Sequence, residues 1–355
     1  MRAWLAGAAC VALLSGCADV GYLGQSVSGH FALMRQARTV NDWLADPATP
    51  PKLRERLQLA LQIRQFAVRE LGLPDNASYR SYADLHRPAA VWNVVAAPEL
   101  SLTLKTWCYP VMGCVGYRGF FDRAQADALA ASLRAQGLDV LVYGVPAYST
   151  LGWSNWLGGD PLLNTFALGS EAELARLMFH ELAHQVAFAA GDTGFNESFA
   201  TAVERTGLQR WQAFTGRAGE DAVRAARRQD VRALTARTRA ELAALYAGTL
   251  PDADKRVAKA QIMATLRQAH TELKSGPWRG DTGYDAWFAR ANNASLAIQL
   301  AYDGQVGAFL ALLDQANGEL PRFYAEVHRL AALPKAERDV TLAATLAGPL
   351  PAPPR

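Results

Sequence analysis

The segment FHELAHQ, residues 179–185, constrains the fold more than any other stretch of this chain. Just upstream, Ser170 and Glu173 have the spacing of a capping box, in which the side chains of two residues three apart close the start of a helix. Gly191 is the next residue that readily ends a helix. The sequence therefore predicts one helix that begins at Ser170 and runs through about Ala189.

Two histidines of this segment can reach a single metal ion. His180 and His184 are four residues apart, so a helix places both imidazoles on one face, one turn apart. Glu181 projects about 100° around the helix, beside such an ion but not on it. A carboxylate in that place accepts a proton from water that a metal has acidified, so Glu181 is the candidate general base. The same short pattern also arises by chance in helices that bind no metal.

A catalytic zinc site usually has three protein ligands and an open position, so a third ligand is expected. The stretch GDTGFNESFATAVERTG predicts a second helix, capped by Thr193 or Asn196, that carries Glu197 and Glu204 on nearly the same face. HELAH followed by NESFATAVE resembles the gluzincin metallopeptidases, in which the glutamate of an Asn-Glu pair completes the zinc site.

The two glutamates compete for the place of third ligand. Glu204 lies twenty residues beyond His184, as in thermolysin-like enzymes, whereas Glu197 lies thirteen beyond it and carries the Asn-Glu signature. Gluzincin aminopeptidases also have a second glutamate seven residues after the ligand. The resemblance therefore favours His180, His184 and Glu197 as the Zn²⁺ ligands, with Glu204 either orienting an imidazole from behind or serving as the alternative ligand.

The likeness extends over most of the chain after its first residues. In order, the motifs CYPVMGCVGYRGFFD, LDVLVYGVPAYSTLGW, DPLLNTF, HELAHQ, FNESFATAVE and WFARANNASL resemble a family of bacterial lipoproteins called putative aminopeptidases. The resemblance implies a gluzincin-like zinc metallopeptidase core. One departure is SNWLGG, residues 154–159, which looks inserted near the mouth of a cleft.

A second departure concerns the substrate's amino terminus. Gluzincin aminopeptidases hold the free amine with a Gly-x-Met-Glu-Asn segment before the histidines, and this sequence contains none. Upstream of Ser170 only weak acidic candidates such as Asp160 are present. Whether the enzyme cleaves at a free terminus or within a chain therefore stays open.

The carbonyl under attack needs a donor for its developing negative charge, usually a Tyr or a His in such enzymes. Tyr302 and Asn293, in NNASLAIQLAY, are the candidates, and Tyr148 is their rival. Residues 147–153, AYSTLGW, are either an edge strand that pairs with the substrate or a packed junction with Tyr148 and Trp153 in the core.

The N-terminus has the pattern of an export signal. Arg2 precedes an apolar run, residues 3–14, that is too short to span a bilayer. The sequence LSGC, residues 14–17, resembles a bacterial lipobox, which implies cleavage before Cys17 and attachment of lipid to its sulfur; the alternative is a plain cleaved signal. Ala18 follows instead of Asp, so the resemblance favours the outer membrane, facing the periplasm.

Export changes how the remaining cysteines are interpreted. Cys108 and Cys114, in CYPVMGC, enclose a short loop, and such a pair in an oxidising compartment most often forms a disulfide. A metal pair is less favoured, because the five intervening residues exceed the usual spacing and no second pair is present.

The composition predicts a folded chain with a substantial core. Half of the residues are apolar, and the net charge of +3 is spread along the chain, so nucleic-acid binding is not indicated. We expect a mainly α protein with a small antiparallel β-sheet, in the α+β class. The expected parts are a signal peptide over 1–16, a lipidated tether over 17–28, one metallopeptidase domain over 29–345 and a disordered tail over 346–355. Within that domain we expect helices over 29–72, a sheet over 91–153 interrupted by a helix at 123–136, and a zinc-binding helical body over 170–345.

Two functions are compatible with these patterns. The first is a zinc peptidase, most simply an aminopeptidase, that acts on peptide substrates while a lipid holds it at the membrane. The second is a non-catalytic lipoprotein that uses zinc to keep its shape and binds a periplasmic partner. A structural zinc normally has four protein ligands, and only three are evident here, which favours catalysis.

Overall fold

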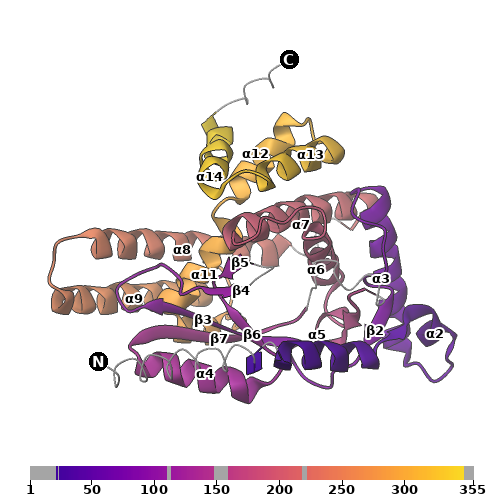
Figure 1. Cartoon of the computed structure of the whole chain (residues 1–355), viewed down its shortest axis with the longest axis horizontal. Helices are drawn as coiled ribbons and strands as arrows, with labels where there is room; N and C mark the ends of the chain where they lie inside the picture. Colours follow the sequence, from indigo (N-terminus) through magenta and orange to yellow (C-terminus); the bar gives the residue numbers. More distant parts are fainter. Residues whose placement is uncertain (1–20, 23, 110–112, 148–158, 218–221, 348–355) are drawn as a thin grey trace, which may run out of the picture.

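The computed structural model describes residues 21–22, 24–109, 113–147, 159–217 and 222–347. Within these ranges the protein is mainly helical with small sheets, as predicted (Figure 1). Residues 24–36 are helical. The further helices are α2 Val40–Ala45, α3 Pro51–Arg69, α4 Arg123–Ala135, α5 Asn164–Ala167, α6 Glu171–Ala183, α7 Thr193–Thr215, α8 Ala222–Ala247, α9 Asp252–Ser275, α10 Asp285–Arg290, α11 Asn293–Asp303, α12 Val306–Gln315, α13 Leu320–Ala331 and α14 Lys335–Ala344. The strands are β1 Arg38–Thr39, β2 Ser81–Ala83, β3 Val91–Pro98, β4 Trp107–Tyr109, β5 Gly113–Val115, β6 Arg118–Phe120, β7 Leu138–Val145 and β8 Leu162–Leu163.

The largest sheet is antiparallel, with strand order β6-β3-β7. Its central strand is buried on both faces, because successive side chains of a strand point to opposite sides. Val94 and Ala96 pack against α4, whereas Val95 and Ala97 pack against α11. This explains why the segment is almost continuously apolar instead of alternating.

Two smaller sheets flank the largest one. Strand β2 lies between β1, antiparallel to it, and β8, parallel to it. Strands β4 and β5 form a hairpin in which Cys108 lies opposite Cys114, and a disulfide joins the two. The parallel β2–β8 pair was not predicted, since its partners are far apart in the sequence.

Part of the region 91–153, where a sheet was predicted, forms no strand. LSLTLKTW, residues 100–107, is irregular except for Trp107, which opens β4. Alternate leucines of this segment pack into two different hydrophobic clusters. Leu102 packs beneath α8 and α9, and Leu104 packs beside α11, so the alternation reflects a loop between clusters and not the two faces of one sheet.

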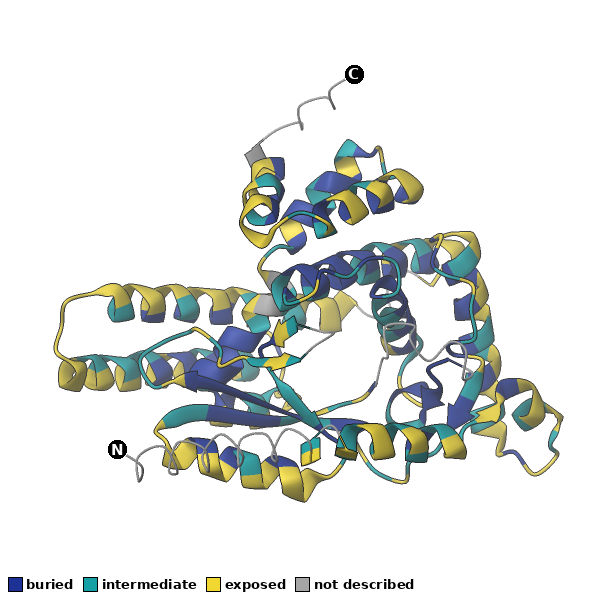
Figure 2. Ribbon diagram, in the orientation of Figure 1, coloured by how far each residue is buried: buried dark blue, intermediate teal, exposed yellow. Residues whose placement is uncertain are grey.

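The principal core surrounds α6 and α7. Leu174, Met178 and Phe179 of α6 are fully buried against this core, and Phe199 of α7 contacts Phe309 of α12. Figure 2 shows the inner faces of α6 and α7 buried, whereas the α8–α9 pair extends from the body with a largely exposed outer face. No helix among the described residues combines the length and apolar character needed to cross a membrane.

Candidate metal centre

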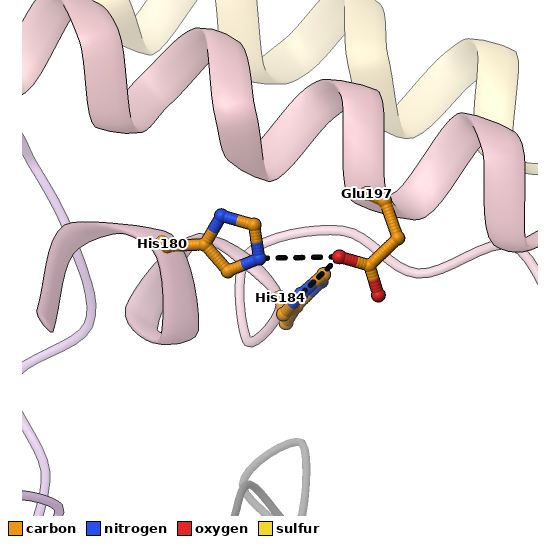
Figure 3. A group of neighbouring side chains, drawn as sticks. All are labelled: His180, His184 and Glu197. Carbon is orange, nitrogen blue, oxygen red and sulfur yellow. Dashed lines mark hydrogen bonds and ion pairs between the residues drawn. The ribbon is translucent and has the colours of Figure 1, made fainter. Parts of the chain in front are cut away.

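Helix α6 begins as predicted. The Ser170 hydroxyl accepts a hydrogen bond from the Glu173 amide at 3.2 Å, and the Glu173 carboxylate accepts one from the Ser170 amide at 2.9 Å. Phe179 and Leu182 are fully buried, which fixes the rotation of the helix about its axis. The neighbouring His180 and His184 are thereby directed toward α7, as Figure 3 shows.

The end of α6 differs from the prediction. The helix stops at Ala183 and not near Ala189, and His184 occupies its C-cap position. Beyond this end the Asn196 side chain holds the chain: its amide oxygen accepts a hydrogen bond from the Ala189 amide at 2.7 Å, and its nitrogen donates to the Ala189 carbonyl at 2.9 Å. These bonds satisfy both backbone groups of Ala189 outside any helix.

The predicted cap of α7 is also wrong. Asp192, and not Thr193 or Asn196, caps this helix by accepting a hydrogen bond from the Phe195 amide at 3.1 Å. Its other carboxylate oxygen accepts hydrogen bonds from Arg338 at 2.9 Å and from Lys335 at 3.1 Å, both on α14. The first turn of α7 is therefore fixed to the C-terminal helices.

The two histidines and Glu197 converge on one point, where they could hold a metal ion. The Nε2 atoms of His180 and His184 lie 3.2 and 3.8 Å from the same carboxylate oxygen of Glu197 (Figure 3). All three donor atoms lie within 4.8 Å of one another. Tetrahedral ligands at about 2.0–2.1 Å from zinc are roughly 3.3 Å apart, so a small inward adjustment of these side chains suits such an ion.

Glu204 lies behind His180 and not among the three. Its carboxylate is 3.3 Å from Nδ1 of His180, and its other oxygen accepts a hydrogen bond from Arg176 at 2.9 Å. An acceptor at Nδ1 keeps the proton on that nitrogen and leaves Nε2 free to bind a metal. This is the arrangement that the sequence predicted for a glutamate that orients an imidazole.

The electrostatics of the cluster favour a cation. Burial by itself lowers the pKa of His180, but hydrogen bonds to Glu197 and Glu204 outweigh it and raise that pKa well above its usual range. Burial alone raises the pKa of Glu197, yet the adjacent imidazoles lower it overall. For His184 burial prevails and lowers the pKa to about 4, so this imidazole is neutral at physiological pH and can act as a ligand.

One comparison with known proteins identifies a family. Residues 21–342 match the family described as Putative aminopeptidase. The chain belongs to this family. The matched segment includes all of α6 and α7, and the family's description indicates a peptidase. No curated protein and no solved structure matches the chain.

Among the predicted donors for the carbonyl oxygen, Tyr302 lies at the site. Its ring stacks on that of His180, with centroids 6.3 Å apart and planes at 24°. Burial raises the Tyr302 pKa well above its usual value, and the charge of Glu197 adds to this effect. The phenol therefore keeps its proton and can donate a hydrogen bond.

Asn293 does not reach the metal centre. Its amide nitrogen donates to the carbonyls of Pro98 and Glu99, and its oxygen accepts a hydrogen bond from Tyr246. It begins α11, whereas Tyr302 lies near the other end, about 13 Å away along the helix axis. Asn293 thus connects β3 to α8, and its prediction as a donor at the site is wrong.

Some predictions fall outside the described residues. These are the lipidation of Cys17, the role of Tyr148, the packing of Trp153 and nearly all of the inserted segment at 154–159. Asp160, the acidic candidate upstream of α6, is described and is 1% exposed.

Three further tyrosines near the site were not predicted. Tyr117 and Tyr143 pack beside Tyr302, and burial raises the pKa of Tyr143 to about 12. Tyr79 is 1% exposed at a left-handed φ of 64°, an uncommon conformation for a bulky residue. Burial and then the charge of Glu181 raise its pKa well above the usual value. Tertiary packing alone brings these side chains together.

Proposed function

We propose that this protein is a zinc-dependent peptidase with a gluzincin-like core, in which His180, His184 and Glu197 hold Zn²⁺. The convergence of these three donors on one point, with Glu204 behind His180, is the observation that carries the proposal. Imidazole and carboxylate are ligands that suit zinc, and three of them leave a position open for chemistry. When bound, the zinc acts as a Lewis acid and increases the acidity of water.

The residues around the proposed metal have complementary roles. Glu181 accepts the proton of the attacking water and later delivers it to the leaving amine. Tyr302, protonated and stacked on His180, donates a hydrogen bond to the carbonyl oxygen as negative charge develops there. Arg176 and Glu204 keep His180 in the required tautomer and orientation.

We propose aminopeptidase action as the form of this activity, on the basis of the family's description. A site for a free amine needs a carboxylate beyond the metal ligands and the general base. Asp160, the acidic residue upstream of α6, is 1% exposed and therefore closed to a substrate amine, so the aminopeptidase proposal rests on the family's description.

The experiment measures metal content first and cleavage second. Purified protein should retain about one zinc per chain after dialysis, and zinc removal should abolish hydrolysis of short peptides. Paired peptides with free and acetylated amino termini then separate the two modes of cleavage. Hydrolysis of the free peptides alone supports an aminopeptidase, and hydrolysis of both indicates an endopeptidase. Zinc binding with no cleavage of either would favour the alternative, a zinc-stabilised lipoprotein that binds a partner.

We also propose that lipid on Cys17 anchors the protein to the outer membrane, facing the periplasm. The lipobox-like sequence at 14–17 supports this proposal. Cys17→Ser should release the protein from the membrane fraction of a bacterial host, because it removes the sulfur to which the proposed lipid is attached. A Cys17→Ser variant that stays in the membrane fraction would contradict the anchor.

A further inference from the structure

The β4–β5 hairpin touches the segment that joins the two metal-site helices. We call residues 184–192 the ligand turn, because they connect His184 to the cap of α7. A side chain at Gly113 would place its Cβ 2.6 Å from the backbone nitrogen and 2.8 Å from the Cα of Gly191. Backbone atoms cannot rotate away from such a contact, so only glycine fits at Gly113.

The backbone conformation gives a second reason for glycine at this position. Gly113 has a φ of +72° and Gly191 has a φ of +74°, both in the left-handed region. A Cβ at Gly191 would meet its nearest neighbour, the Cys114 amide nitrogen, at an ordinary 3.6 Å. The steric restriction therefore acts at Gly113, on the hairpin side of the contact.

The hairpin is held by its own disulfide. Cys108 pairs with Cys114 across the two strands, and Gly113 immediately precedes Cys114. A two-stranded hairpin of this length is at best marginally stable alone, so the covalent link restricts it to few conformations. The disulfide thus holds Gly113 where it meets the ligand turn.

The ligand turn contains no helix or strand that would hold its shape. Helix α6 has already ended at Ala183, so His184 lies outside it. The Asn196 amide and the Asp192 cap hold the turn from the α7 side. On the opposite side, the described residues place the hairpin backbone at Gly113 directly against Gly191.

We infer that the disulfide-closed β4–β5 hairpin positions the ligand turn, and through it the spacing between His184 and Glu197. This inference rests on the proposed metal site. Metal–ligand bonds tolerate deviations of only about 0.2 Å, whereas a Cβ at Gly113 must displace the Gly191 backbone by more than that. Gly113 and the two cysteines are therefore positioning residues that never touch the substrate.

The test compares alanine substitutions at two glycines that have a similar φ but differ in the space available to a Cβ. Gly137, after α4, has a φ of +78° like Gly113, but a Cβ there meets nothing within 4 Å. Gly113→Ala and Gly137→Ala therefore carry a similar backbone penalty, and only Gly113→Ala presses on the ligand turn. We would measure Zn²⁺ affinity by competition with a chromophoric chelator and record the visible spectrum of the Co²⁺-loaded proteins.

Gly137→Ala should bind Zn²⁺ like the wild type and keep its Co²⁺ spectrum. Gly113→Ala should bind Zn²⁺ about tenfold more weakly or worse, which is the usual effect of disturbing a ligand's support, and its Co²⁺ spectrum should change. Equal affinities for the two variants would overturn the inference while leaving the metal site intact. Wild-type protein that binds no Zn²⁺ would overturn the metal site itself, and the inference with it.

A second variant covers the case in which Gly113→Ala does not fold. Replacing both cysteines, with Cys108→Ser and Cys114→Ser, removes the covalent link and adds no bulk. Because the hairpin then samples more conformations, Zn²⁺ affinity should fall severalfold, with the far-ultraviolet circular dichroism unchanged. A double variant that binds Zn²⁺ as tightly as the wild type would contradict a positioning role for the disulfide.

Discussion

The α6–α7 and α8–α9 pairs are both built from adjacent helices, yet they differ in how many ionisable groups they bury. Between α6 and α7 the buried or nearly buried groups include two histidines and two glutamates. Between α8 and α9 the contact is made mostly by Leu234, Leu242 and Leu266, and charged residues such as Arg237 and Glu241 lie on the surface. Burying ionisable groups costs free energy, and a stable helix pair does not need them. Their concentration between α6 and α7 therefore indicates function.

The largest expected effect is a loss of Zn²⁺ affinity, and it should distinguish two histidines that are equally buried. His184 of α6–α7 and His270 of α8–α9 are each 7% exposed. His184→Ala should weaken Zn²⁺ binding by more than about a hundredfold, since loss of an outer partner alone costs 10–100-fold. His270→Ala should lower the free energy of unfolding by about 0.5–3 kcal/mol and leave Zn²⁺ binding intact. If both variants lose metal equally, Zn²⁺ binding does not distinguish α6–α7 from α8–α9.

The next effect is a loss of kcat when Glu181, the proposed general base, is replaced. Glu181→Gln removes the proton acceptor and keeps its shape, so kcat should fall by about 10²–10⁴ while the zinc content stays the same. Glu241→Gln in α8 is the control, because this glutamate is exposed and its ion pair within the described part of the chain is with Arg237. Undiminished peptide hydrolysis by Glu181→Gln would refute its assignment as the base.

A tyrosine pair tests the proposed hydrogen-bond donor. Tyr302→Phe should lower kcat by about 10²–10³ with little change in KM. The hydrogen bond from the Tyr302 hydroxyl strengthens only as negative charge develops on the substrate carbonyl oxygen. Tyr246→Phe removes a hydroxyl from α8 that donates to Asn293, far from the metal centre, and should leave kcat unchanged. If the two variants have the same kcat, Tyr302 is a packing residue.

The last comparison concerns stability and its dependence on pH. The Asp192 carboxylate is 3% exposed and paired with Arg338 at 4% exposure. Asp192→Asn leaves that arginine buried without its counter-charge, which should cost about 3–5 kcal/mol, whereas removing the exposed Glu241 partner of Arg237 costs about 0–1 kcal/mol.

The sign of the pH effect follows from the lowered pKa of Asp192. Burial raises this pKa, but the Phe195 amide and the α14 cations outweigh burial and hold it below its ordinary value of 3.8. The stabilisation is thus present above pH ~4 and is lost as the pH falls through the folded-state pKa. Denaturant unfolding should show the gap between wild type and Asp192→Asn narrowing below pH ~4. A constant gap would indicate that the carboxylate charge is not responsible.

Local patterns predicted the parts of the site that depend on neighbours in sequence. The capping box at Ser170, the spacing of His180 and His184 and the Asn-Glu pair all act within a few turns of helix. The strands β3 and β7 were likewise evident from short apolar runs bounded by turns. Such features are visible in one sequence because the residues that make them are adjacent in it.

The remaining features depend on contacts between distant segments. The Asn196 side chain bonds to the Ala189 backbone beyond the early end of α6, and the Asn293 amide donates to the end of β3 and not to the candidate metal centre. The left-handed Tyr79 and the contact of Gly113 with Gly191 likewise leave no periodic pattern. The sequence predicted which three side chains converge, but not the surroundings that hold them.

The most direct test of the central claim is anomalous X-ray scattering at the zinc edge from crystals of the zinc-loaded protein. The account predicts one peak about 2.0–2.2 Å from Nε2 of His180, Nε2 of His184 and a carboxylate oxygen of Glu197, with no fourth protein ligand. A peak elsewhere, or one coordinated by four protein side chains, would contradict a catalytic site between α6 and α7.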